Sequence, residues 1–245
     1  MQKAIQILAC AVLLTTPASA EVKHLVTGND YKPFTDEDMK DGGLVTAIVR
    51  EAYAGEGHGV KVSFTSWKRG ARMVETGKAS VHFPLVKTEA RLKKFAYSEP
   101  VFVSELVPAV RPEDRGTYTS MAALKNGKTC MPIGWAFGVA ELDEARASGA
   151  LDVERPDEMG ACYRLLAAGR VDYLVLDAPT INIDAKTFLG DADKVRVEDF
   201  KLGETRLHAV FDKDGDPAEV AAFNEALAAL KASGRYQALV TAYLD

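Results

Sequence analysis

The chain has 245 residues, 47% of them hydrophobic and 27% charged, and its formal net charge at pH 7 is −5. This composition is ordinary for a globular protein and argues against intrinsic disorder. The negative balance argues against a protein that binds nucleic acid through electrostatic attraction, and the length allows one large domain or two modest ones.

The first twenty residues predict a secretory signal peptide. Lys3 supplies a positive charge, residues 4–14 form an apolar region, and small residues at 18–20 form a cleavage site. The apolar run is too short to span a bilayer, which takes about 20 residues. A lipoprotein signal at Cys10 is the alternative, but that position leaves too little apolar sequence before it. We therefore expect cleavage after Ala20 and a periplasmic protein.

The sequence that follows alternates between strand and helix patterns. Apolar residues at helical spacing predict helices, and alternation of apolar with polar residues predicts half-buried strands. The predicted strands are 22–27, 60–65 and 81–86, and the predicted helices are 44–54 and 67–76. Ser66 is expected to cap the second helix. A β-α-β-α-β order is typical of a parallel sheet flanked by helices.

Residues 88–100 follow the third strand and are predicted to form a loop before the next apolar run, 101–110. Arg91 lies in this segment close to a strand end, where α/β proteins usually bind their ligands. A guanidinium there can hold a carboxylate through two parallel hydrogen bonds. The alternative is that Arg91 is one of several solvated basic residues.

The second half of the chain repeats the alternation. Strands are predicted at 128–133, 151–154, 171–176, 195–200 and 206–211, and helices near 120–124, 139–147, 158–168, 179–188, 217–232 and 234–244. Two such units joined by a strand-rich connection suggest two lobes with a cleft between them. The alternative is one doubly wound sheet of eight or nine strands.

Further candidates for ligand contacts lie at other strand ends. Tyr31, Trp67 and Trp135 could stack on a ligand, or could simply pack in the core. Gly134 would let the backbone approach a ligand closely and would expose N–H groups. Asp177 suits an ammonium group, or it caps the helix that follows it.

Cleavage of the signal peptide leaves Cys130 and Cys162 in an oxidising compartment, which suggests a single disulfide. Two separately buried thiols are the alternative. The four histidines are scattered without the spacing of metal ligands. The sequence also lacks a nucleophile elbow, a suggestive Cys-His pair and a phosphate-binding glycine loop. We expect no metal, no cofactor and no catalysis, with an acid/base site as the open alternative.

Four short motifs occur in a characteristic order. They are Y-K-P-F at 31–34, T-x-x-R at 88–91 with S-E-P at 98–100, G-R-V-D at 169–172 with Asp177 five residues beyond, and F-N-x-A-L at 223–227 with G-x-Y at 234–236. Together they make the chain resemble the bacterial extracellular solute-binding proteins of family 3, the polar amino-acid type that serves ABC importers.

The resemblance implies a periplasmic binding protein-like α/β fold of type II, with two lobes and two crossovers. Lobe 1 would comprise residues 21–103 and 204–245, and lobe 2 residues 104–203. Arg91 would grip the α-carboxylate of the ligand and Asp177 its α-ammonium. Tyr31 and Trp67 would flank the ligand side chain, and the loop at 134–135 would supply contacts from the second lobe.

The chain departs from this family just before the arginine motif. Amino-acid binders usually have small or hydroxyl residues there, whereas this chain has Phe83, Pro84 and Val86, and Pro84 lacks an N–H donor. The acidic G-F-D-x-D segment of many relatives is replaced by G-L-V-T-A at 43–47. Part of the ammonium site is therefore missing, and Phe83 would make the pocket more aromatic than usual.

From these features we expect a monomeric, non-catalytic binding protein for one small polar solute that bears a carboxylate. Its partner would be the permease of an ABC transporter, and nucleic acid is not expected as a partner. One alternative is a periplasmic lyase on the same fold, similar to cyclohexadienyl dehydratase. Another is a sensory or accessory protein that presents its ligand to a receptor.

Overall fold

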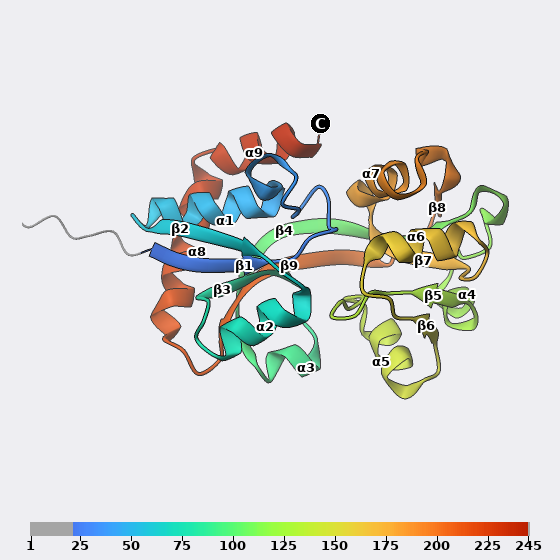
Figure 1. Ribbon diagram of the computed structural model, residues 1–245, viewed down its shortest axis with the longest axis horizontal. Coiled ribbons are helices and arrows are strands. Elements are labelled where there is room, and N and C mark those ends of the chain that lie inside the picture. Colours follow the sequence, from blue (N-terminus) through green and yellow to red (C-terminus); the bar gives the residue numbers. More distant parts are fainter. Residues whose placement is uncertain (1–21, 245) are drawn as a thin grey trace, which may run out of the picture.

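The structure, a computed structural model, describes residues 22–244 and consists of two α/β lobes (Figure 1). The expected signal peptide and its cleavage after Ala20 lie outside the described residues. Two long strands, β4 (Phe95–Val110) and β9 (Gly203–Asp212), run through both lobes and form the two crossovers between them. The predicted two-lobed α/β fold is therefore confirmed.

The first lobe is a sheet with helices on both faces (Figure 1). Its parallel strands are β1 (Val22–Thr27), β2 (Gly59–Phe64) and β3 (Val81–Leu85), and β3 pairs antiparallel to β9. The helices are α1 (Leu44–Gly55), α8 (Pro217–Ala232) and α9 (Arg235–Leu244) on one face and α2 (Trp67–Glu75) and α3 (Glu89–Leu92) on the other, with the 3-10 turn η1 (Lys40–Gly42) before α1.

The second lobe repeats this layering with shorter strands. They are β5 (Lys128–Cys130), β6 (Asp152–Glu154), β7 (Tyr173–Asp177) and β8 (Arg196–Val197). The helices are α4 (Met121–Asn126), α5 (Ala140–Ser148), α6 (Met159–Ala167) and α7 (Ala178–Leu189), with 3-10 turns η2 (Pro112–Asp114) and η3 (Ala192–Lys194). Within residues 22–244, none of the helices is long and apolar enough to cross a membrane.

Hydrogen bonds join the strands of both lobes into one sheet, in the order β2-β1-β3-β9-β4-β7-β5-β6 with β8 paired to β4. The two alternatives raised by the sequence are therefore both partly realised. The backbone forms a single nine-stranded sheet, and its two ends carry separate sets of helices.

Each lobe buries its own hydrophobic core. In the first lobe, α1 turns a stripe of fully buried residues at helical spacing toward the sheet, including Leu44, Ile48 and Ala52. In the second lobe, residues of β7 alternate between two apolar clusters on opposite faces of the sheet, as strand geometry requires. Leu174 belongs to one cluster and Val175 to the other.

The prediction of a loop over residues 88–100 is wrong for most of that segment. Thr88 caps the short helix α3, and β4 begins at Phe95. Pro100 hid this strand in the sequence, because proline cannot donate to a strand ladder. In the structure it lies at an irregularity where the register of β4 against β9 shifts, between Tyr97 and Phe102.

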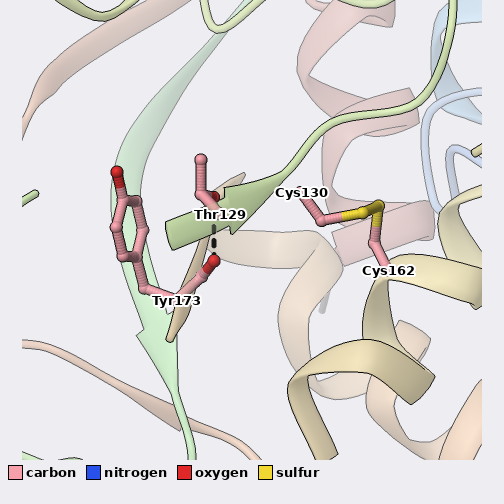
Figure 2. Close-up of a disulfide and its surroundings, with 4 residues drawn as sticks. All are labelled: Thr129, Cys130, Cys162 and Tyr173. Carbon is pink, nitrogen blue, oxygen red and sulfur yellow. Dashed lines mark hydrogen bonds between the residues drawn. A yellow bond between two sulfur atoms is a disulfide. The ribbon is translucent and has the colours of Figure 1, made fainter. Parts of the chain in front are cut away.

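Cys130 at the end of β5 and Cys162 in α6 form a disulfide, with their Cα atoms 5.4 Å apart (Figure 2). The bond ties β5 to the helix that covers it. Beside it, Thr129 Oγ1 donates a 2.8 Å hydrogen bond to the carbonyl of Tyr173 in β7. The predicted disulfide is therefore confirmed over the alternative of two separate thiols.

Candidate functional site

Arg91 lies in α3, where the first lobe faces the second. Thr88 starts this helix, since its Oγ1 accepts a hydrogen bond from the Arg91 amide at 3.2 Å. The guanidinium reaches two backbone carbonyls: Nη1 donates to Val86 at 3.0 Å, and Nη2 donates to Gly134 of the second lobe at 2.6 Å. Arg91 therefore bridges the two lobes.

The guanidinium of Arg91 forms no direct ion pair within residues 22–244, because none of the ion pairs there includes it. Burial lowers the pKa of Arg91, yet a guanidinium keeps its proton in proteins. Asp143 is close enough for its negative charge to oppose this shift, but the direct hydrogen bonds of the guanidinium go to carbonyl dipoles, which compensate a partly buried charge poorly. The position therefore favours a bound anion, and a carboxylate matches the planar guanidinium best.

Three aromatic side chains meet between the lobes. The ring centroid of Trp135, in the second lobe, lies 4.8 Å from that of Tyr31 and 5.5 Å from that of Trp67. The rings of Tyr31 and Trp67, both in the first lobe, lie 6.2 Å apart. All three pairs pack edge to face, an arrangement that contributes favourably beyond area burial. The aromatic cluster therefore holds the lobes together.

Two glycines make room for Trp67. A Cβ at Gly28 would lie 2.2 Å from the indole ring, so a larger residue there would displace it. Gly134 has a φ of +88°, which strains any side chain, and a Cβ there would lie 3.1 Å from Trp67 Cβ. Gly134 is therefore required both by its own backbone and by its contact with the other lobe.

Asp177, at the end of β7, contacts the first lobe through Tyr31, whose hydroxyl donates a short hydrogen bond to Asp177 Oδ2. Asp177 is also the N-cap residue of α7, but its side chain makes no capping hydrogen bond to a described residue. Burial raises the pKa of Asp177 to about 6, against the opposing effects of the Tyr31 hydrogen bond and of the nearby Thr205 and Ser104 hydroxyls.

A buried polar group surrounds the second oxygen of Asp177. Asp177 Oδ1 and the hydroxyls of Ser104 and Thr205 are buried and lack hydrogen-bond partners among the described residues. Ser104 and Thr205 face each other in the pairing of β4 with β9. Tyr31 lines the inter-lobe cavity and Asp177 does not, so Tyr31 separates this polar group from the cavity.

The inter-lobe cavity has a volume of about 40 Å³. It is lined by Tyr31, Trp67, Pro84, Val86, Arg91, Gly134, Trp135, Ala136 and Leu207. A cavity of this size holds a few water molecules at most. A larger solute can enter only if the lobes open or the aromatic side chains move.

Two larger cavities adjoin this one, and Trp67 belongs to the wall of all three. The first, of about 340 Å³, is also lined by Arg91 and the buried His82. The second, of about 460 Å³, is also lined by Trp135 and by acidic residues that include Glu158. Movement of the Trp67 ring would therefore connect the small cavity with substantial neighbouring space.

Five of the seven residues predicted to contact ligand line the inter-lobe cavity: Tyr31, Trp67, Arg91, Gly134 and Trp135. Asp177 lies behind Tyr31, and its capping interpretation is wrong for the side chain. Ser66 likewise occupies the N-cap of α2, but its side chain makes no capping bond with any described residue.

Phe83 does not reach the cavity. It is fully buried in the core of the first lobe, and its carbonyl accepts a 2.6 Å hydrogen bond from Thr27 Oγ1. Ala136 and Leu207 line the cavity and were not predicted. The apolar alternation of 206–211 indicates that Leu207 is buried, but it carries no sign that β9 passes the cleft.

A second buried acid lies on α7. Asp184 is 2% exposed, and burial, together with the negative charges of Asp30 and Asp36, raises its pKa to about 8. Asp30 and Asp36 belong to the loop after β1 in the first lobe, so this interaction also crosses between the lobes. Asp184 Oδ1 has no hydrogen-bond partner among the described residues.

The arrangement around Arg91 suits non-covalent binding of a small anion. The cavity offers one buried cation and several aromatic faces, and its lining residues include no acid. Within residues 22–244, no group of three or more His, Cys, Asp or Glu side chains is placed to hold a metal ion.

Two lobes that enclose a cleft with a bridging arginine define a ligand-binding protein of the two-lobed class. The chain belongs to the bacterial extracellular solute-binding proteins, family 3, whose profile matches residues 24–245. None of the curated proteins has a sequence significantly similar to this chain.

Solved structures with the same fold include sensor and transport proteins. A histidine kinase sensor domain with similarity to periplasmic binding proteins has a TM-score of 0.77 and 21% identity, covering 91% of this chain and 96% of that chain. An amino acid ABC transporter substrate-binding protein from Streptococcus pneumoniae, bound to L-arginine, has a TM-score of 0.73 and 21% identity, covering 91% and 94%.

A third structure is an ancestral amino acid-binding protein described as a precursor of cyclohexadienyl dehydratase. Its TM-score is 0.73 at 22% identity, and the likeness covers 91% of this chain and 95% of that chain. At these identities the likenesses establish the fold alone.

Proposed function

We propose that this chain is a periplasmic binding protein that captures a small carboxylate-bearing solute, an amino acid or a related acid, and delivers it to an ABC importer. The protein acts as a monomer, without catalysis and without a cofactor. Membership of the solute-binding family supports the class of function. The solute, the permease and export through the signal peptide are parts of the proposal.

The observation that carries the proposal is the state of Arg91. Its guanidinium is held by carbonyls of Val86 and Gly134 on opposite sides of the cleft, without an ion-pair partner among the described residues. An anion placed there would give this partly buried charge the direct ion-pair partner that it lacks among the described residues. Carboxylates are the anions that arginine holds with two parallel hydrogen bonds.

The proposed lobes are residues 21–103 with 204–245, and residues 104–203. A solute bound by Arg91 and Trp67 of the first lobe would also meet Gly134 and Trp135 of the second. Its contacts with the second lobe exist only when the cleft is closed, so binding shifts the equilibrium toward the closed state. In the proposed cycle, this closed state is the form that the permease recognises.

A sensory role is the second candidate. It is supported by the likeness to a histidine kinase sensor domain, and by the contacts that the protein's own side chains make across the cleft. Catalysis has less support, because a lyase would need an acid in the cavity. Asp177 is the buried acid at this place, and it lies behind Tyr31.

A thermal-shift screen of the mature protein against amino acids, organic acids and polyamines tests the proposal. A ligand at about 100 times its Kd raises the free energy of unfolding by about 2.7 kcal/mol. We expect a carboxylate to stabilise the wild-type protein and an Arg170→Ala control, which changes an exposed arginine, but not Arg91→Ala. If only polyamines stabilise the protein, or if Arg91→Ala keeps the full shift, the proposal fails.

A further inference from the structure

Asp177, the acid expected to receive an ammonium group, already has a partner inside the protein. Its Oδ2 accepts the hydrogen bond from the Tyr31 hydroxyl, and the residue is 4% exposed. Tyr31 stands between Asp177 and the cavity, which has no acidic lining residue of its own. A buried ammonium group needs hydrogen-bond acceptors. An α-amino acid could obtain this one only by displacing the Tyr31 hydroxyl.

The backbone around Arg91 offers few replacement acceptors. The Val86 carbonyl accepts from Arg91 Nη1 at 3.0 Å and from the Tyr97 hydroxyl at 3.3 Å. The Gly134 carbonyl accepts from Arg91 Nη2 at 2.6 Å. The Phe83 carbonyl accepts from Thr27 Oγ1 at 2.6 Å, and Phe83 does not line the cavity. The walls around the guanidinium therefore favour an anionic group and leave a neighbouring ammonium group poorly supported.

The remaining lining is apolar and mostly flat. Tyr31, Trp67 and Trp135 present rings, and Pro84 and Leu207 add apolar surface. Aromatic rings pack favourably edge to face or offset-stacked against other flat groups. The shape and polarity of this lining suit the body of a ligand that is itself flat and apolar.

The adjoining cavity of about 340 Å³ continues this apolar character beyond Trp67. Leu85, Phe95 and the fully buried His82 line it. Burial and the nearby charge of Arg91 lower the pKa of His82 to about 3, so the imidazole is neutral at physiological pH. Basic residues such as Lys68 and Arg72 outnumber the one acid of the lining, Glu75, and they favour anions over cations.

We propose that the cleft binds a carboxylate with a flat, apolar body and no ammonium group, and that Tyr31, through its hydrogen bond to Asp177, is the residue that discriminates against α-amino acids. This inference rests on the proposed function and narrows its solute to one chemical class. Arg91 holds the carboxylate. An ammonium group would leave either itself or the Tyr31 hydroxyl without a partner, which is unfavourable in a buried site.

Calorimetric titration of the wild-type mature protein with three matched compounds tests the proposal. 3-Phenylpropanoate has the carboxylate and the ring, L-phenylalanine adds the α-ammonium group, and 2-phenylethylamine has the ammonium group without the carboxylate. We expect 3-phenylpropanoate to bind at least about tenfold more tightly than L-phenylalanine, since one unmet buried hydrogen bond is worth about that factor. We expect 2-phenylethylamine not to bind.

Variants then test the part played by Tyr31. Tyr31→Phe keeps the ring and frees Asp177, so L-phenylalanine should gain affinity. The ratio of the affinity for 3-phenylpropanoate to that for L-phenylalanine should therefore fall. Tyr236→Phe is the matched control. Tyr236 lies in α9, away from the cavity, and this variant removes a hydroxyl that donates to the Val101 carbonyl at 3.1 Å. Asp177→Asn keeps an acceptor for Tyr31 and should leave the ratio unchanged.

Three results would overturn this inference. They are equal or tighter binding of L-phenylalanine, tighter binding of L-arginine through the acidic cavity beside Trp135, and absence of binding by 3-phenylpropanoate. Each leaves the proposed function to be judged separately, because the screen of carboxylates against Arg91→Ala does not depend on which carboxylate binds. If Tyr31→Phe fails to fold, the wild-type ratio and the Asp177→Asn variant still decide the outcome.

Discussion

The two lobes contribute unlike walls to the cleft. The wall of the first lobe carries the charge of Arg91 and the rings of Tyr31 and Trp67. The wall of the second lobe presents a backbone carbonyl at Gly134 and the ring of Trp135. Charge recognition therefore belongs to one lobe, while the other supplies a surface that closes over it.

The walls also differ in what holds them in place. Arg91 lies on a short helix capped by Thr88 and is positioned locally. The segment with Gly134 and Trp135 depends on its surroundings, because it follows the disulfide at Cys130. At its other end, Asp143 accepts hydrogen bonds from the amides of residues 137 and 138 at 3.2 and 3.0 Å. A substitution well outside the cleft can therefore displace the second wall.

Removal of the Arg91 side chain from the first wall should have the largest effect on binding. We expect Arg91→Ala to weaken the affinity for the carboxylate ligand by about 2–5 kcal/mol, the usual result of removing one partner of a buried charge pair. Arg91→Lys should lose less, because it keeps the charge but not the two parallel hydrogen bonds. Calorimetric titration measures both, with Arg170→Ala as control. Near-native affinity of Arg91→Ala would contradict the role given to this wall.

Removal of the disulfide tests the second wall. A variant with Cys130→Ala and Cys162→Ala should have a free energy of unfolding lower by about 2–4 kcal/mol, because the unfolded chain is no longer constrained. Denaturant unfolding measures the change. A reducing agent should lower the stability of the wild-type protein and leave that of the variant unchanged. A variant as stable as the oxidised wild-type protein would show that the second wall does not need this bond.

A lower pH should stabilise the folded protein. The pKa of Asp184 is raised to about 8 and that of Asp177 to about 6, above their ordinary value of 3.8. The folded protein therefore binds more protons than the unfolded chain between about pH 4 and 8. Its stability should rise as the pH falls through this range, by at most about 1.4 kcal/mol per pH unit for each carboxyl.

Thermal unfolding across this pH range measures the effect. Asp184→Asn should flatten the upper part of the profile and Asp177→Asn the lower part, whereas the exposed Asp214→Asn should follow the wild type. If the profile of Asp184→Asn matches that of the wild type between pH 6 and 8, the assignment to this carboxyl is wrong.

The smallest effect is expected where the two walls join. Thr205→Val removes a buried hydroxyl that lacks a partner among the described residues, so the free energy of unfolding should change by less than about 1 kcal/mol. Thr129→Val is the matched control, because the Thr129 hydroxyl donates to Tyr173 and its loss should destabilise by about 1 kcal/mol or more. Equal losses in the two variants would show that Thr205 has a partner.

Much of the fold can be predicted from the sequence where periodicity is strong. The strand at 22–27 and the helix at 217–232 are found at their predicted bounds. The short strands of the second lobe are predicted too long. β5 ends at Cys130, although apolar residues continue to Ile133, because Pro132 cannot donate to a ladder. Apolar character marks burial there, but strand length depends on which neighbours pair.

The candidate site can be predicted only in part. Arg91 and Trp67 follow strand ends, so their place in the chain indicates their place in the fold. The bond between Tyr31 and Asp177 joins residues 146 positions apart and exists only where the lobes meet. Local patterns therefore indicate that Asp177 is a free acid or a helix cap. They do not reveal its hydrogen-bond partner, Tyr31, which belongs to the other lobe.

The pairing of β4 with β9 has a mechanical consequence. It extends from Phe95 opposite Asp212 to Leu106 opposite Gly203, and so it crosses from one lobe into the other. The lobes can bend and twist about these two strands, but they cannot slide or separate while the ladder is intact. Heating should therefore melt both lobes in a single cooperative transition, and the amides of this ladder should be among the last to exchange with deuterium.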